Sequence, residues 1–279
     1  MSRDIYLFQD FEYQSIDREI SSIYRKIASL DESDVDYEAI SLEKKNDRGA
    51  PRVCYFICYV NRVGTTFLSE CLSQTHIFGL PQEYLNTEEG ANSVERISKR
   101  FGANSFVDYL SHLTRKRQSE TGVFGTKIGC LQLAYITKKY DINSIFPNAK
   151  FIFVTRQDVV LQAVSWFVAV KTASWASFDK ARNNVDYDRD EIIRFVNLIT
   201  DQNAKFENYF ALNGIYPLRI SYEEINDDIR DVVHRVKDYL GVDREIDLQV
   251  DETRCKVQRT SKNTEWANRL IEEVKRIYD

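Results

Sequence analysis

The sequence lacks the cysteine and histidine patterns that hold metal ions or build disulfide frameworks. Its five cysteines are scattered, none forms a CxxC pair, and the three histidines lie far apart along the chain. An odd number of scattered cysteines is typical of reduced thiols that pack as small apolar groups in a cytoplasmic protein. We therefore expect no metal site, no disulfide framework and a cytoplasmic location.

A long apolar run and an excess of positive charge are also missing. No stretch reaches the ~18 consecutive apolar residues of a membrane span. The N-terminal segment MSRDIYLFQDFEYQ has no continuous apolar core like that of a signal peptide. The 38 basic residues are outnumbered by 43 acidic ones, which gives a net charge of −5. We expect no membrane span, and the charge gives no support to nucleic acid as a partner.

The chain does contain enough apolar residues for a large core, 43% of 279. Unbroken apolar runs alternate with helical segments, which is typical of a parallel sheet covered on both faces. We therefore predict an α/β fold with a central parallel sheet flanked by helices. The strands are expected at 53–60, 123–128, 150–155 and 215–221, and the main helices at 65–74, 131–145, 158–170, 183–212, 225–240 and 264–278.

The first 50 residues differ from the rest of the chain. Residues 13–30 carry apolar side chains at helical spacing, and the polar residues after them indicate a linker. We predict a helical N-terminal appendage and linker over 1–50 and a single domain over 51–279. Two interpretations of the appendage stay open: a dimer element or lid, and simple packing on the parent domain.

The turn after the first predicted strand is suited to hold an anion. Ligands of parallel sheets bind at the carboxyl ends of the strands, where the stretch YVNRVGTTFLSECL at 59–72 begins. Gly64 lets the backbone approach a ligand, and the helix from Thr65 presents free N–H groups. Thr65 and Thr66 can add hydroxyl donors, and Arg62 supplies a charged fork that matches phosphate or sulfate. The same motif also suits a plain strand–turn–helix with a surface arginine.

The turn has no lysine before its threonines, so it fails the triphosphate-binding pattern GxxxxGK[ST]. No carboxylate is obviously placed for magnesium after a later strand. Both absences argue against triphosphate hydrolysis. They leave a phosphate-like group that is held without a metal.

A second anion site is expected after the strand at 150–155. Arg156 stands at the strand tip, and Ser165 lies about two turns into the next helix. The two side chains could hold an anion together. Alternatively, Arg156 pairs with Asp158 or another carboxylate, and Ser165 is a small packing residue.

Five segments spread over 53–266 form a joint pattern: the RxGTT loop, PQEY at 81–84, GTK at 125–127, FVTRQDVVLQAVS at 153–165 and QRTSKNTEW at 258–266. Taken together and in this order, they resemble the bacterial trehalose 2-sulfotransferase type of carbohydrate sulfotransferase. The resemblance implies a P-loop-like sulfotransferase fold and 3′-phosphoadenosine 5′-phosphosulfate (PAPS) as donor.

The resemblance implies that three of these segments bind PAPS. The loop would grip the 5′-phosphosulfate, the later strand end the 3′-phosphate, and the C-terminal segment would close over the nucleotide. The loop departs from the commoner family form at Asn61 and Val63, where a proline or glutamine and a serine are frequent, so one hydroxyl donor is lost. The matching residues are Arg62, Gly64, Thr65 and Thr66 in the loop, Arg156 and Ser165 at the strand end, and Gln258 and Arg259 in the C-terminal segment.

A general base is implied as well. Sulfuryl transfer resembles phosphoryl transfer, in which the group moves in line through a loose state with spread charge. Arg62 would stabilise the leaving bisphosphate. Glu83 matches the family's proposed base, and we expect a partly closed cleft to raise its pKa toward neutrality. His76 is the rival base.

The acceptor side is less defined. Lys127 is a candidate electrophile or acceptor-site residue, while Trp166 and Trp175 could stack on a sugar or belong to the core. We predict transfer to a hydroxyl of a small acceptor, a carbohydrate or bacterial secondary metabolite. N-sulfation of an amine or guanidine stays open, as do a small-molecule or nucleotide kinase and a non-catalytic nucleotide-binding module. Because the family often pairs its chains, a homodimer is also considered.

Overall fold

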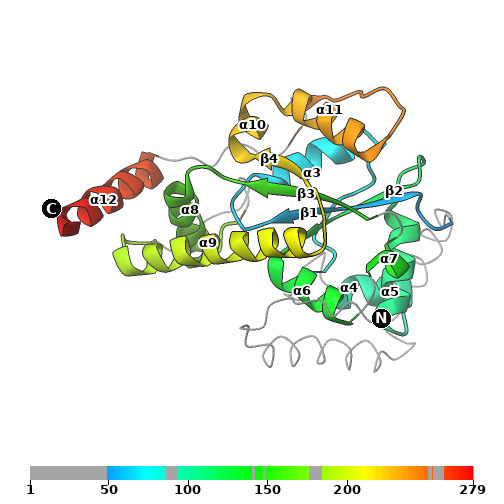
Figure 1. Ribbon diagram of the computed structural model, residues 1–279, viewed down its shortest axis with the longest axis horizontal. Coiled ribbons are helices and arrows are strands. Elements are labelled where there is room, and N and C mark those ends of the chain that lie inside the picture. The colour runs from blue at the N-terminus through cyan, green and yellow to red at the C-terminus, as the bar shows by residue number, and fades with distance from the viewer. Residues whose placement is uncertain are drawn as a thin grey trace.

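A computed structural model describes residues 49–85, 94–139, 142–146, 149–175, 184–250, 253 and 261–278. In this part of the chain four strands form one parallel sheet in the order β2-β1-β3-β4 (Figure 1). The predicted α/β class is therefore confirmed. The strands are β1 (Val53–Tyr59), β2 (Val123–Ile128), β3 (Lys150–Thr155) and β4 (Leu218–Ser221).

The strand order places the end of β1 at the point where the chain switches direction across the sheet. From β1 the chain passes to β2 on one side, then to β3 on the other. The strand ends lie level, because Ile57 of β1 is in register with Lys127 of β2 and Ile152 of β3. A crevice at such a switch point is the usual ligand site of an open α/β sheet.

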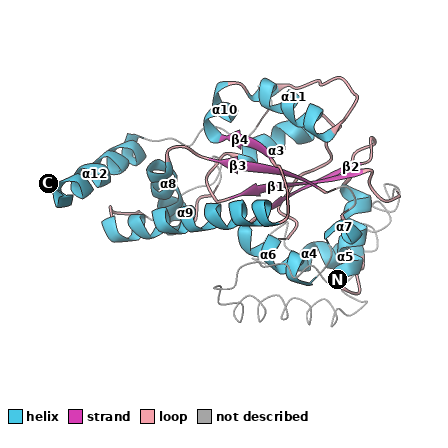
Figure 2. Ribbon diagram, viewed as in Figure 1, coloured by secondary structure: helices cyan, strands magenta, loops and turns pink. Residues whose placement is uncertain are grey.

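Helices cover both faces of the sheet (Figure 2). Their apolar side chains form two buried clusters, one against each face, which explains why β1 and β2 are apolar or buried along almost their whole length. On one face lie α3 (Thr65–Gln74), α10 (Tyr222–Asp227) and α11 (Ile229–Leu240); on the other lie α4 (Val94–Phe101), α5 (Phe106–Arg117), α6 (Cys130–Lys139), α7 (Ile142–Ile145), α8 (Val159–Thr172) and α9 (Arg189–Leu212), with α12 (Ser261–Tyr278) packed on α8.

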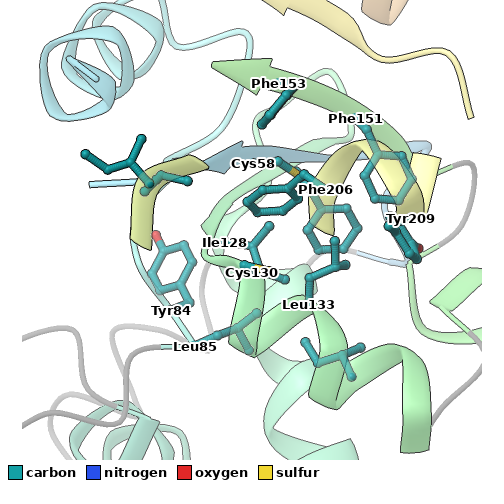
Figure 3. Close-up of a cluster of buried hydrophobic side chains, with 14 of the residues drawn as sticks. Cys58, Tyr84, Leu85, Ile128, Cys130, Leu133, Phe151, Phe153, Phe206 and Tyr209 are labelled. Atoms are coloured by element: carbon teal, nitrogen blue, oxygen red, sulfur yellow. The ribbon is translucent and has the colours of Figure 1, made fainter. Parts of the chain in front are cut away.

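The buried cluster between the sheet and helices α4 to α9 is rich in aromatic rings. Figure 3 shows Cys58 and Phe153 from the sheet beside Phe206 and Leu133 from the helices below it. The Phe153 and Phe206 rings lie 5.3 Å apart. Burial raises the pKa of the Cys58 thiol well above its usual value. Such a thiol is an unreactive apolar group, as expected from the sequence.

Several predicted boundaries change. Helices α4 and α5 lie in a stretch where no helix was predicted. The predicted helix 225–240 is divided, because the Asp228 side chain accepts hydrogen bonds from the Arg230 and Asp231 N–H groups and so starts α11 anew. The predicted strand at 215–221 is shorter, and the appendage at 1–50 lies almost entirely outside the described residues.

The described residues contain neither a candidate membrane span nor a candidate metal cluster. None of the helices in these ranges has the length and apolar character needed to cross a membrane. Among the same residues, no group of three or more histidine, cysteine or acidic side chains could hold a metal ion.

Candidate active site

The turn between β1 and α3 is tightly wound. Arg62 has φ 73° and Gly64 φ 80°, so two of its residues adopt the left-handed conformation. Helix α3 then begins at Thr65 with no acidic side chain in its first turn. Its N-terminus is therefore free of negative charge from its own first turn, which favours an anionic ligand.

Val63, where the resemblance expected a serine, is 1% exposed and packs in the cluster beneath α3. This position contributes to the core. Thr65 beside it is also buried, whereas Thr66 is exposed. The exposed hydroxyl is thus the one at Thr66.

Arg156 follows β3 and lies against the same turn. Arg156 is buried, with 8% of its surface exposed. Its guanidinium donates to the Arg62 carbonyl at 3.4 Å and lies 4.2 Å from the Tyr222 ring centre. The Tyr222 ring in turn lies against Gly64, where a Cβ would approach it to 3.0 Å. Sequence analysis missed Tyr222, although it directly follows β4 and so stands at the same edge of the sheet.

The Arg62 side chain reaches from the turn to α8. Its Nε donates to the Ser165 hydroxyl at 3.0 Å, and Nη1 donates to the Trp175 carbonyl. Ser165 therefore lies beside Arg62, the cation of the first predicted anion site. Asp158, the alternative partner considered for Arg156, accepts a hydrogen bond from the Leu161 N–H at 2.8 Å and caps α8.

Gln162 joins α8 to the turn between β1 and α3 by a hydrogen bond. It is fully buried, and its Nε2 donates to the Asn61 carbonyl at 2.8 Å. Its Oε1 is buried without a hydrogen-bond partner among the described residues. This residue was not predicted, because a glutamine on an apolar helix face carries no pattern that distinguishes it from a packing residue.

Glu83 reaches the carboxyl edge by a different route. The chain from Gly79 to Glu83 runs beside β2, where Gln82 bridges Thr126. The Gln82 carbonyl accepts from the Lys127 N–H at 2.9 Å and from the Thr126 hydroxyl at 3.0 Å. This segment thus acts as a short extension of the sheet, and it places Glu83 beside the end of β2.

Glu83 and Lys127 form an ion pair, with Oε1 and Nζ 2.9 Å apart. The lysine side chain is 5% exposed and the glutamate 36%. Burial raises the pKa of Glu83, but the charge and hydrogen bond of Lys127 and a hydrogen bond from Tyr59 outweigh it, so the pKa is lowered from 4.5. The expectation of a raised pKa is therefore wrong, because it left out the cation beside the carboxylate.

Of the remaining predicted site residues, Trp175 adjoins the residues described above. His76 lies beyond the C-terminal end of α3, a helix of ten residues and so about 15 Å from the turn at its start. Trp166 is buried against Phe195, with ring centres 5.2 Å apart, so its ring belongs to the core. Trp175 is 44% exposed and adjoins Arg62. Gln258 and Arg259 lie outside the described residues.

Comparison with known proteins identifies the family of this chain. The family described as Stf0 sulphotransferase matches residues 54–273. A trehalose 2-sulfotransferase of Mycobacterium tuberculosis (strain ATCC 35801 / TMC 107 / Erdman) is 23% identical over 259 residues, covering 80% of this chain and 96% of that protein. The crystal structure of a sulfotransferase from Alicyclobacillus acidocaldarius aligns with a TM-score of 0.44 at 15% identity, over 77% of this chain and 89% of that one. The family match spans most of the chain, and the chain therefore belongs to the Stf0 sulphotransferase family and is a sulfotransferase.

Proposed function

We propose that this sulfotransferase takes its sulfuryl group from PAPS and transfers it to a hydroxyl of a small carbohydrate. The observation that carries the proposal is the arrangement at one edge of the sheet. Two arginines and an acid-free helix N-terminus adjoin the end of β1, while the carboxylate of Glu83 stands beside the end of β2. Anion-binding groups and a proton acceptor thus flank the same switch point.

The donor would bind with its two anionic ends on separate groups. The 5′-phosphosulfate is assigned to the turn with Arg62, Gly64, Thr65 and Thr66, where helix N–H groups and a guanidinium suit an anion that gains charge as it leaves. The 3′-phosphate is assigned to Arg156 and Ser165, although the Ser165 hydroxyl accepts a hydrogen bond from Arg62 in this structure. Gln258 and Arg259 stay candidates for closure over the nucleotide.

A hydroxyl acceptor fits the Glu83 site better than a cationic amine. The charge of Glu83 is already balanced by Lys127 at 2.9 Å, so this pair offers no surplus negative charge to a protonated amine. A neutral hydroxyl needs only a proton acceptor at hydrogen-bond distance. The named relative acts on trehalose, which makes trehalose the first acceptor to test.

The direct test measures transfer of label from ³⁵S-labelled PAPS. Trehalose, glucose and a metabolite extract are offered as acceptors in separate reactions, and a primary amine is offered in a further one. We expect label on a carbohydrate and a mass increase of about 80 Da, the mass of SO₃ added in such a transfer. Label on the amine alone would favour N-sulfation, and no transfer to any acceptor in the presence of extract would contradict the proposal.

Three further points stay proposals. We place the reaction in the cytoplasm, in keeping with buried thiols such as Cys54 and Cys130. We treat residues 1–50 as an appendage to a domain over 51–279. A homodimer is the assembly to look for, and light scattering of the purified chain would decide it.

A further inference from the structure

Lys127 is a charged side chain held almost completely out of water. A buried ammonium is costly unless it is paired, so its partner is part of the reason for its position. That partner is Glu83, and the pair is fixed on both sides. Gln82, next to the glutamate, accepts hydrogen bonds from the Lys127 backbone and from the Thr126 side chain, next to the lysine. The backbone bonds thus hold the two charged residues at a set distance.

Tyr59 completes the group from the neighbouring strand. It is the last residue of β1, it hydrogen-bonds to the Glu83 side chain, and its ring centre lies 6.0 Å from the Lys127 ammonium. Glu83 is therefore contacted by a cation from β2 and a phenol from β1. Two strands and the segment beside them together fix one carboxylate at the carboxyl edge.

We propose that Lys127 is a positioning residue for the transfer reaction: its ammonium holds the Glu83 carboxylate ionised and in place beside Tyr59, ready to accept the proton of the acceptor hydroxyl. The proposal rests on the proposed function, in which Glu83 is the base. Lys127 itself need not touch the acceptor. It acts through Glu83 by charge and by a hydrogen bond.

The dependence on pH follows from the titratable groups that face Glu83, which among the described residues are Lys127 and Tyr59. Together they lower the pKa of Glu83 below 4.5 against the opposing effect of burial. Glu83 is then deprotonated throughout the neutral range, and activity is lost only as the pH falls through this lowered pKa. Burial is the largest single cause acting on this pKa, and the next two, the charge and the hydrogen bond of Lys127, oppose it. Without Lys127 the pKa therefore rises, and the loss of activity begins at a higher pH.

The experiment uses the full chain and two readouts. The first is a carbon-13 NMR titration of the Glu83 carboxyl, assigned with Glu83→Gln, and the second is kcat and KM as functions of pH. In Lys127→Met we expect the titration midpoint and the acid limb of kcat to move to higher pH. We also expect kcat at pH 7 to fall about 10- to 100-fold, with the KM for the donor unchanged. Lys127→Arg should restore the midpoint and most of kcat.

Two further variants make the result specific. Lys150→Met removes a strand lysine at the opposite edge of the sheet, where its ammonium donates to the Tyr239 carbonyl at 2.6 Å, and it should change neither readout. Lys127→Gln keeps a polar donor without the charge and replaces Lys127→Met if that variant does not fold.

A wild-type midpoint and kcat in the uncharged variant would overturn the proposal. Normal turnover in Glu83→Gln would also overturn the proposal, since Glu83 would then not be the proton acceptor. A third outcome separates this proposal from the proposed function. If the titration midpoint moves as expected but the protein transfers no sulfuryl group, the proposed function and the role of Lys127 in transfer are overturned. The effect of Lys127 on the ionisation of Glu83 would still stand.

Discussion

Arg62 and Arg156 bring two permanent positive charges to the same turn, yet they differ in how they are held. Arg156 is buried by Tyr222 and bonded to the backbone of the turn, whereas Arg62 extends to Ser165 and Trp175 on another element. An anion held by Arg156 therefore meets a group that is already oriented. An anion held by Arg62 must either displace the hydrogen bonds of that side chain to Ser165 and Trp175 or bind beside them.

Replacing Arg156 with alanine should remove the preference for a 3′-phosphate. A charge-assisted hydrogen bond contributes about 1.5–3 kcal/mol, which corresponds to roughly a 10- to 100-fold change in affinity. Calorimetry would compare adenosine 3′,5′-bisphosphate with adenosine 5′-phosphate. Arg219→Ala is the control and should keep the preference, because it removes an exposed arginine of β4 that is paired with Glu207 of α9. Discrimination that survives in Arg156→Ala would move the 3′-phosphate elsewhere.

Replacing Glu83 with glutamine should abolish most of the turnover while leaving the donor site intact. A positioned general base contributes about 10²- to 10⁴-fold, so kcat should fall within that range. Stabilisation by adenosine 3′,5′-bisphosphate in a thermal melt should stay as in the wild type. His76→Gln, at the far end of α3, should have normal kcat. Wild-type turnover in Glu83→Gln would assign the proton to another group.

At the scale of elements, the sequence was most informative where both faces of a strand are buried. The bounds of β2 and β3 were predicted correctly, because VFGTKI and KFIFVT are short β-type runs. Helix α5 was missed, although Ser105 caps it and its buried Phe106, Tyr109 and Leu113 follow helical spacing. The helical spacing of these apolar residues was therefore present in the sequence, next to the largely charged stretch TRKRQSE at 114–120.

The contacts of the site could not be predicted in the same way. Sequence analysis placed Arg62, Arg156 and Lys127 at strand ends, because that follows from the parallel sheet. The bond from Arg62 to Ser165 joins residues 103 positions apart, and the pairing of Glu83 with Lys127 depends on the preceding segment returning beside β2. No local pattern of side chains encodes such a return.

Gly79 begins that segment, and its replacement by alanine tests how the segment is held. Its φ is +75°, and a Cβ would lie 2.7 Å from the Val123 carbonyl oxygen and 2.9 Å from that of Arg117. Both atoms belong to the backbone, so we expect a loss of about 2–4 kcal/mol from left-handed strain and overpacking together. Urea unfolding measures it, and kcat should fall as well because Glu83 is displaced.

The matched control for this variant is Gly214→Ala. Gly214 also has a positive φ, +62°, but a Cβ there would have no atom within 4 Å. It should therefore cost only the left-handed strain of about 1–2 kcal/mol, with no change in kcat. Equal losses in the two variants would mean that the backbone beside Gly79 yields, and that the segment does not hold Glu83 rigidly.

On the scale of the whole molecule, the sheet, the turn and both arginines belong to a single packed unit, so a ligand at the edge should stabilise the entire fold. A ligand present at 100 times its Kd adds about 2.7 kcal/mol to the free energy of unfolding. For a chain of this size each kcal/mol raises Tm by about 2–4 °C, so adenosine 3′,5′-bisphosphate should raise Tm by roughly 5–10 °C.

The same melt separates the donor assignment from the kinase alternative. Adenosine triphosphate with magnesium should give a smaller shift, because the turn lacks the lysine that a triphosphate site uses. In Arg156→Ala the shift by the bisphosphate should fall to that of adenosine 5′-phosphate, since the bisphosphate then loses the 3′-phosphate contact that adenosine 5′-phosphate never makes. A large shift with the triphosphate and none with the bisphosphate at millimolar concentration would contradict the PAPS assignment, because a donor that binds only the folded chain must stabilise it.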